Sequence, residues 1–114
     1  MKKFLVLYHA PVDAMAQTMN VPPEQQAEGM KAWMQWAQKC GDKLVDMGSP
    51  LVNGQQLKSD GSITNSNKEV AGYSMLQAEN MDEAKSLMEG HPHISGWHPG
   101  AFIEVHETMA IPGM

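Results

Sequence analysis

The sequence contains no arginine, only one cysteine and no long apolar run. All eight basic residues are lysines, and thirteen acidic residues bring the formal net charge to −5. Lysine lacks the planar fork that contacts phosphate or guanine through two hydrogen bonds, so we expect no nucleic-acid partner. A single cysteine, Cys40, excludes an internal disulfide and a thiolate metal cage. No segment approaches the roughly 20 apolar residues that cross a bilayer, so we expect no membrane partner.

The first residues imitate a secretory signal without completing one. Two lysines precede the apolar stretch that begins at Phe4, and small residues flank Met15 at 14–16. The apolar stretch ends before His9 and is therefore too short to be the apolar region of a signal peptide. We therefore predict a cytoplasmic protein.

The composition is typical of one folded domain. The 114 residues are 42% hydrophobic and 18% charged, with ten glycines and seven prolines. A chain of this length buries roughly two-thirds of its unfolded surface, which is enough to fold without disulfides or a structural metal. We predict a single domain over residues 1–114.

Periodicity predicts a strand and then a long helix in the first half of the chain. The apolar run at 3–9 predicts a central strand that is buried on both faces. After Pro22 and Pro23, apolar residues recur at spacings of three and four and predict one helix that ends at Gly48. The expected buried stripe contains Met30, Trp33, Met34, Ala37, Cys40, Leu44 and Val45, with Trp36 and Met47 at its edge.

The second half of the chain predicts a hairpin, a strand, a short helix and a last strand. Asn-Gly and Asp-Gly turns leave room for short strands at about 55–58 and 62–65, and a longer strand follows at 69–78. Asn80, three residues before Glu83, predicts the start of a helix at 81–89. Alternation over 101–109 places Ile103, Val105 and Met109 on one face and Phe102, Glu104 and His106 on the other.

This order, β-α-β-β-α-β, predicts an α+β ferredoxin-like fold, in which two helices cover one face of an antiparallel sheet. The other face stays open. Its strands are apolar, so it would expose a larger apolar patch than monomers usually carry. We therefore expect a homodimer in which a second copy covers this face.

Several segments together resemble the YCII-related, or DGPF-type, proteins. They are Lys-Phe-Leu-Val-Leu-Tyr-His at 3–9 and the stretches at 41–51, 72–76, 90–94 and 103–105. The resemblance implies a dimeric α+β barrel, in which two ferredoxin-like sheets face each other. It also implies a family largely without assigned activity, one branch of which resembles enzymes that eliminate chloride from a chlorinated muconate-type acid.

The chain departs from this family in two places. The Asp-Gly-Pro-Phe signature stands here as Asp60-Gly61-Ser62-Ile63. Some members carry a histidine in the first helix that pairs with an aspartate, but no histidine lies between Glu24 and Gly48. Asp46 alone cannot take the role of that dyad.

Five histidines are the main chemical resource of the sequence: His9, His91, His93, His98 and His106. Imidazole acts as an acid or base near neutral pH and, when neutral, binds metals. The spacing of His91 and His93, with Glu104 and His106 on a neighbouring strand, is compatible with a metal site. Against a metal site stand Pro92 and Pro99, which make the loop a rigid connector in which the histidines would cap helix carbonyls or project into solvent. Acid–base, substrate-binding and structural roles stay open, and we expect neither a metal nor another cofactor.

Glu104 and His106 share one face of the last predicted strand. If the helices cover the opposite face, this pair looks into the space between the two sheets of a dimer, where a carboxylate favours a protonated imidazole. The alternative is a hydrated sheet edge. The candidate catalytic residues are His9, His93, Glu104 and His106, and the candidate substrate contacts are Tyr8, Tyr73, His91, Trp97 and His98.

A single positioned base in a dry pocket suits a lyase or isomerase step. We expect binding of a small, unsaturated or acidic organic molecule in an apolar cleft. Two alternatives stay open: a non-catalytic dimeric module for ligand sensing or interaction, and a cofactor-independent oxygenase, which rests on fold analogy alone.

Overall fold

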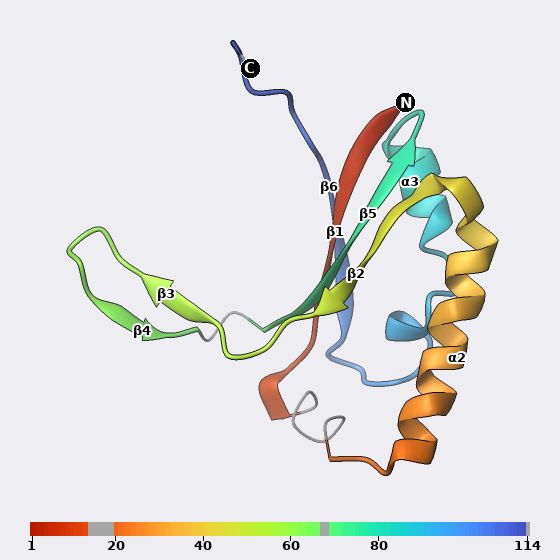
Figure 1. The fold of residues 1–114 in the computed structure, drawn as a ribbon, viewed down its shortest axis with the longest axis horizontal. Coiled ribbons are helices and arrows are strands. Elements are labelled where there is room, and N and C mark those ends of the chain that lie inside the picture. The colour runs from red at the N-terminus through yellow and green to blue at the C-terminus, as the bar shows by residue number, and fades with distance from the viewer. Residues whose placement is uncertain (14–19, 67–68, 114) are drawn as a thin grey trace.

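A computed structural model describes residues 1–13, 20–66 and 69–113. The strands are β1 (Lys2–His9), β2 (Leu44–Pro50), β3 (Gln55–Leu57), β4 (Ile63–Asn65), β5 (Val70–Ala78) and β6 (Phe102–Glu107). The helices are α2 (Pro23–Cys40) and α3 (Met81–Leu87), with the 3-10 turns η1 (Gly41–Lys43) and η2 (Pro92–Ile94). Both α-helices lie on the same side of the main sheet, and the hairpin β3–β4 projects away from it (Figure 1).

The main sheet has four strands in the order β2-β5-β1-β6, and every neighbouring pair is antiparallel. Along the chain these strands and the two α-helices follow the order β-α-β-β-α-β. The predicted α+β ferredoxin-like fold and the central position of β1 are therefore confirmed.

The core lies between this sheet and the helices. Alternate residues of β1 and β5 face the helices and are fully buried, among them Phe4, Val6 and Leu76. The residues between them, such as Leu5, Leu7 and Met75, are only partly buried, because nothing in the described chain covers the second face of the sheet. The prediction that β1 is buried on both faces is wrong for a single chain.

The predicted long helix ends at Cys40, not at Gly48. Gly41 adopts φ 59°, and its N–H donates to the Ala37 carbonyl, which closes the helix. Residues 44–50 form the edge strand β2 instead. Gly48, with φ 77°, is needed there because a Cβ would lie 1.7 Å from the Tyr73 carbonyl oxygen of β5.

The buried stripe of α2 is shorter than predicted. Trp36 and Cys40 are buried, whereas Met30 and Met34 are 52% and 46% exposed. The buried positions lie in the carboxyl-terminal half of the helix, so the prediction of an inward methionine pair is wrong. Burial raises the pKa of the Cys40 thiol, in keeping with its predicted role as a small hydrophobic residue.

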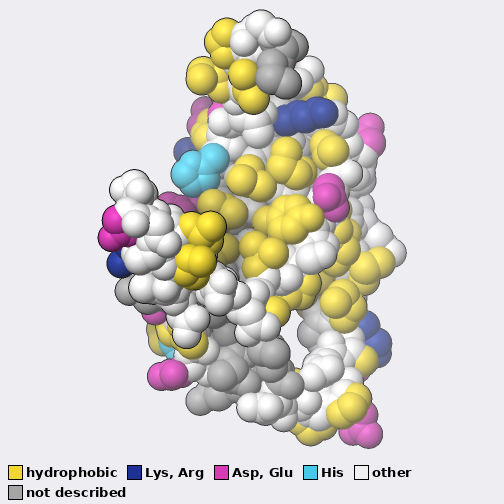
Figure 2. Space-filling model, turned by 60° about the vertical axis from the view of Figure 1, so that its left-hand side comes forward, with side chains coloured by type: hydrophobic (Ala, Val, Ile, Leu, Met, Phe, Trp, Pro, Cys, Tyr) yellow, Lys and Arg dark blue, Asp and Glu magenta, His cyan; other side chains and the backbone are white. Residues whose placement is uncertain are grey.

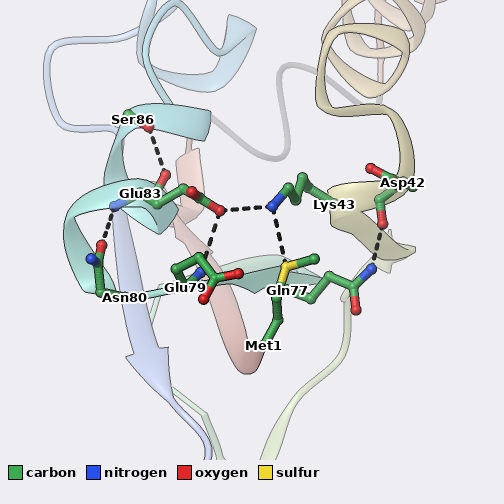
Figure 3. Close-up of polar contacts among 8 residues, drawn as sticks. All are labelled: Met1, Asp42, Lys43, Gln77, Glu79, Asn80, Glu83 and Ser86. Atoms are coloured by element: carbon green, nitrogen blue, oxygen red, sulfur yellow. Dashed lines mark hydrogen bonds and ion pairs between the residues drawn. The ribbon is translucent and has the colours of Figure 1, made fainter.

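Polar contacts join η1 to α3 at one end of the sheet (Figure 3). Lys43 Nζ lies 3.0 Å from Glu83 Oε1 and also contacts the Met1 sulfur at 3.1 Å. Gln77 Nε2 donates to the Asp42 carbonyl at 2.7 Å. The hydrogen bond between Lys43 and Glu83 raises the pKa of the lysine and lowers that of the carboxyl group.

The predicted cap of the second helix is confirmed, since Asn80 Oδ1 accepts the Glu83 N–H at 2.8 Å. The last strand is shorter than predicted. Met109 lies beyond it and is 87% exposed, so its predicted place on the Ile103 face is wrong. The small residues at 14–16 lie outside the described residues. Among those described, we find no helix with the length and apolar character needed to cross a membrane.

Candidate functional site

Three of the predicted catalytic residues meet on the open face of the sheet. His9 of β1 and Glu104 and His106 of β6 lie on adjacent strands. His9 Nε2 is 2.6 Å from Glu104 Oε1, and His106 Nε2 is 3.8 Å from the same oxygen. The His9 side chain is 14% exposed, while those of Glu104 and His106 are about half exposed. A carboxylate thus stands between two imidazoles on a face partly lined by apolar side chains.

The contact between His9 and Glu104 is close but lies outside hydrogen-bond geometry. His9 Nε2 is buried and has no hydrogen-bond partner among the described residues. It forms an ion pair with Glu104 whenever the ring is protonated. The site therefore contains a ring nitrogen that lies against a carboxylate but forms no hydrogen bond with it.

A backbone bulge and one aromatic neighbour fix the place of His9. The strand register shifts between Tyr8 and His9, which marks a bulge against β5. The His9 ring then stacks on Phe102, with centroids 4.5 Å apart and planes only 4° from parallel. Phe102 was not among the predicted site residues, although the alternation of the last strand places it on the face of Glu104 and marked it as a neighbour.

His93 and His91 lie on the opposite side of the sheet, under the helices. Both are buried, so His93 does not share the open face with the other predicted catalytic residues. It reaches them through the backbone, because its Nε2 donates to the His9 carbonyl at 2.8 Å. Burial lowers the pKa of His93 and favours the neutral ring.

His91 fills an aromatic cluster. Its ring stacks on Tyr8 with centroids 5.0 Å apart and meets the rings of Trp33 and Trp36 at 4.4 Å each. Nδ1 accepts the His93 N–H at 2.9 Å, so the proton of the neutral ring is on Nε2, which has no hydrogen-bond partner in the described chain. Burial lowers the pKa of His91 to about 3.

The two predicted tyrosines lie on opposite faces of the sheet. Tyr8 is in the core, where its hydroxyl donates to Ser74 Oγ at 2.8 Å and Ser74 donates to the Met47 carbonyl at 2.6 Å. Burial raises the pKa of Tyr8 to about 12, so it stays a neutral core residue. Tyr73 pairs with Leu7 of the open face. Ser74 was missed in the sequence because a buried serine has no periodic signature.

The remaining loop residues have local roles. Trp97 is 41% exposed, and its ring lies 5.3 Å from that of His93. His98 Nδ1 accepts the Gly100 N–H at 2.9 Å and so shapes its own turn. Within residues 1–13, 20–66 and 69–113, no group of three or more His, Cys, Asp or Glu side chains could hold a metal ion.

The linings of two hollows in the surface include neither His9 nor Glu104. One, of about 390 Å³, is lined by Trp36, Lys39 and Pro92, among others, between α2 and η2. The other, of about 720 Å³, lies at the foot of the β3–β4 hairpin and includes Val12, Val52 and Val70. Neither hollow is lined by the three residues of the open face.

Comparisons with known proteins give a structural neighbour and a matching family. A solved structure with 17% sequence identity and a TM-score of 0.47, covering 90% of each chain, is a 5-chloro-2-hydroxyhydroquinone dehydrochlorinase from Burkholderia phenoliruptrix AC1100 in complex with 2,5-dihydroxybenzoquinone. No functionally curated protein gives a significant match. The model of the YCII-related domain matches residues 1–106, and the chain therefore belongs to the YCII-related family.

Proposed function

We propose that the chain binds a small organic acid on the open face of the sheet and that His9, held by Glu104, transfers a proton to or from it. The observation that carries this proposal is the 2.6 Å contact between His9 Nε2 and Glu104 Oε1. The surrounding face is largely apolar, with Leu5, Leu7 and Met75 on adjacent strands. Small-molecule sites commonly combine an apolar wall with a few polar groups of this kind.

A carbon acid is the substrate class that this arrangement suits. The neutral His9 ring would accept, at Nδ1, a proton from the carbon next to a carbonyl group, because Nε2 is buried against Glu104, whose carboxylate would stabilise the imidazolium so formed. The electron pair of the broken C–H bond becomes an enolate. The enolate either expels a group from the neighbouring carbon, as in a lyase, or takes the proton back at another carbon, as in an isomerase.

A second copy of the chain would turn this open face into a cleft. Within one chain Glu104 and His106 stay about half exposed, and water would weaken their electrostatic effect. A facing sheet would exclude that water and supply the opposite wall. The expected homodimer is therefore part of the proposed function.

Exchange of ligand C–H groups for deuterium in D2O tests the proposal without knowledge of the final product. We expect at least one member of a panel of small unsaturated and 2-oxo acids to exchange in the presence of the protein. His9→Gln and Glu104→Gln should each slow this exchange by about 100-fold or more, the usual contribution of a general base. Glu107→Gln is the matched control, because Glu107 is on the same strand but pairs with Lys2 at 3.3 Å.

The outcomes separate an enzyme from a binding module. Exchange that is unchanged in both His9→Gln and Glu104→Gln would exclude this pair as the base. An acid that shifts the NMR signals of the open face but never exchanges would favour a ligand-sensing role. Native mass spectrometry of the protein as purified would show whether a ligand is retained.

A further inference from the structure

The β3–β4 hairpin is an arm, residues 51–66, that projects from the rest of the chain (Figure 1). It forms a two-stranded sheet of its own and is not part of the four-stranded sheet. The radius of gyration is 15.7 Å. A compact domain of this length has about 13 Å. The arm therefore extends the molecule well beyond a compact shape.

One face of the arm, called its apolar side below, carries the pair Leu57 and Ile63 and, next to it, the polar pair Gln55 and Asn65; the other face is polar. Leu57 and Ile63 are paired directly across its two strands, so their side chains share a face, and they are 77% and 60% exposed. Gln56 and Thr64 are paired on the opposite face and touch each other at 3.5 Å. An isolated two-stranded hairpin is marginally stable in water, so exposure of its apolar side is costly.

The tip of the arm is nevertheless well formed. Asp60 Oδ1 accepts the Ser62 N–H at 2.8 Å and the Ser62 hydroxyl at 2.7 Å. The Lys58 N–H donates to the Ser62 carbonyl at 2.9 Å, and the Ser66 N–H donates to the Gly54 carbonyl at 2.8 Å. The hairpin thus presents its apolar side in a defined shape.

The apolar side of the arm continues the apolar surface of the open sheet face. Figure 2 shows hydrophobic side chains over that face and, next to them, on the projecting arm. The foot of the arm is attached there, since the Leu51 N–H donates to the Ala71 carbonyl of β5 at 3.0 Å. Val52, also at the foot, is 59% exposed.

The sheet face alone presents a limited flat area to a second copy. Four strands of six to nine residues, about 4.8 Å apart, present a flat face of roughly 500 Å². A stable interface buries about 800 Å² of accessible surface on each partner, a measure that includes the relief of the side chains and so exceeds the flat outline of the same face. The arm is the adjoining apolar surface that extends the face toward this size.

We propose that the apolar side of the arm packs against a second copy of the chain and so widens the interface over the open sheet face. This inference rests on the dimer of the proposed function. A two-fold pair covers both arms and both sheet faces at once, because each copy carries the same two surfaces. Leu57 and Ile63 are then interface residues.

Sedimentation velocity of the full chain over a range of concentrations tests this inference. The variant Leu57→Lys/Ile63→Lys should raise the dimer dissociation constant by about tenfold or more, because both side chains would place charge in an apolar contact. The matched control, Gln56→Lys/Thr64→Lys, adds the same charge to the polar side of the same hairpin and should change the constant less than about twofold. Circular dichroism confirms that each variant is folded.

The failure of the arm contact and the failure of the dimer give different results. A Leu57→Lys/Ile63→Lys dimer as tight as the wild type would overturn the arm contact, while weakening by Leu5→Lys/Met75→Lys would keep the face-to-face dimer. Weakening by the arm variant but not by the sheet variant would support the arm and contradict the proposed cleft. A wild-type chain that stays monomeric at every concentration would overturn both.

Discussion

At the scale of single residues, His91 illustrates how a polar side chain is held in a core. It is fully buried among three aromatic rings, yet its Nδ1 accepts the His93 N–H, which fixes the tautomer. A phenylalanine would fill the same space without accepting that hydrogen bond. The ring must stay neutral, because an imidazolium in this cluster would lose its hydration.

The stability of the protein should therefore fall in mild acid. The pKa of His91 is lowered from 6.5 to about 3. Above pH 6.5 the ring is neutral in both the folded and the unfolded chain, so it does not affect the pH dependence of stability there. Below that pH the unfolded chain binds a proton at this histidine and the folded chain does not. The free energy of unfolding therefore decreases as the pH falls toward 3. At pH 5 this linkage amounts to about 2 kcal/mol. Urea unfolding at pH 7.5 and at pH 5 measures it.

His91→Phe isolates this effect. The variant should be less stable at pH 7.5, since the His93 N–H loses its acceptor, but its stability should fall by about 2 kcal/mol less between pH 7.5 and 5. The lowered pKa of His93 leaves a smaller slope in the same direction. Asn80→Ala, which removes neither a titratable group nor any ring of the cluster around His91, should keep the full pH dependence. An equal slope in the wild type and His91→Phe would contradict the assignment.

His93 is expected to position His9 through the backbone. His93→Leu removes the donor to the His9 carbonyl, which should cost about 1 kcal/mol and loosen the bulge that turns the His9 ring onto Phe102. NOEs between the two rings should weaken in His93→Leu and return in His93→Gln, whose amide can donate. Unchanged NOEs in His93→Leu would show that the bulge is held by other contacts.

The positions of the candidate site residues could be predicted from the sequence only for those that lie in strands. Alternation along the last strand placed Glu104 and His106 on the face opposite Ile103, and the structure confirms this and adds His9 to the pair. His93 comes from a loop, where no periodicity indicates which side of the sheet a ring will take. The contact of its ring with the His9 carbonyl depends on tertiary packing alone.

At the scale of elements, the end of the first helix could be predicted at either of two glycines, Gly41 or Gly48. The apolar spacing continues past Gly41 to Leu44 and Val45, and this made Gly48 the predicted end. A strand that alternates poorly, such as β2 at the edge of the sheet, can imitate a helical stripe over a few residues. The strands β1, β5 and β6 and the capped helix were predicted because their signals are longer or more specific.

The cap of α3 offers a direct test at this scale. Asn80→Ala removes the acceptor for the Glu83 N–H and should lower the free energy of unfolding by about 1 kcal/mol. For a domain of this size the melting temperature should fall by about 4 °C. Asn80→Ser keeps an oxygen at the cap and should lose little. Equal melting temperatures for Asn80→Ala and the wild type would mean that α3 is held by the packing of Ala84 and Met88 alone.

At the scale of the whole molecule, the helices cover one face of the sheet and leave the other with the polar pair and several apolar side chains. The sequence predicts this asymmetry because the strands are apolar on both faces and two helices are predicted to cover one of them. The projecting arm was predicted as a hairpin, but its position outside the main sheet was not, because turn residues fix a hairpin without fixing where it packs.

If a second copy covers this face, the stability of the protein must depend on its concentration. Association stabilises the folded state by mass action. A hundredfold rise in total protein concentration should therefore increase the free energy of unfolding by about 2.7 kcal/mol per dimer. The melting temperature should then rise by about 5 °C, measured by calorimetry at the two concentrations. Leu57→Lys/Ile63→Lys should reduce this rise, because a weaker dimer dissociates before it unfolds. A melting temperature that is independent of concentration would indicate that the open face and the arm stay in contact with water, and that the marginal hairpin is stable without a partner.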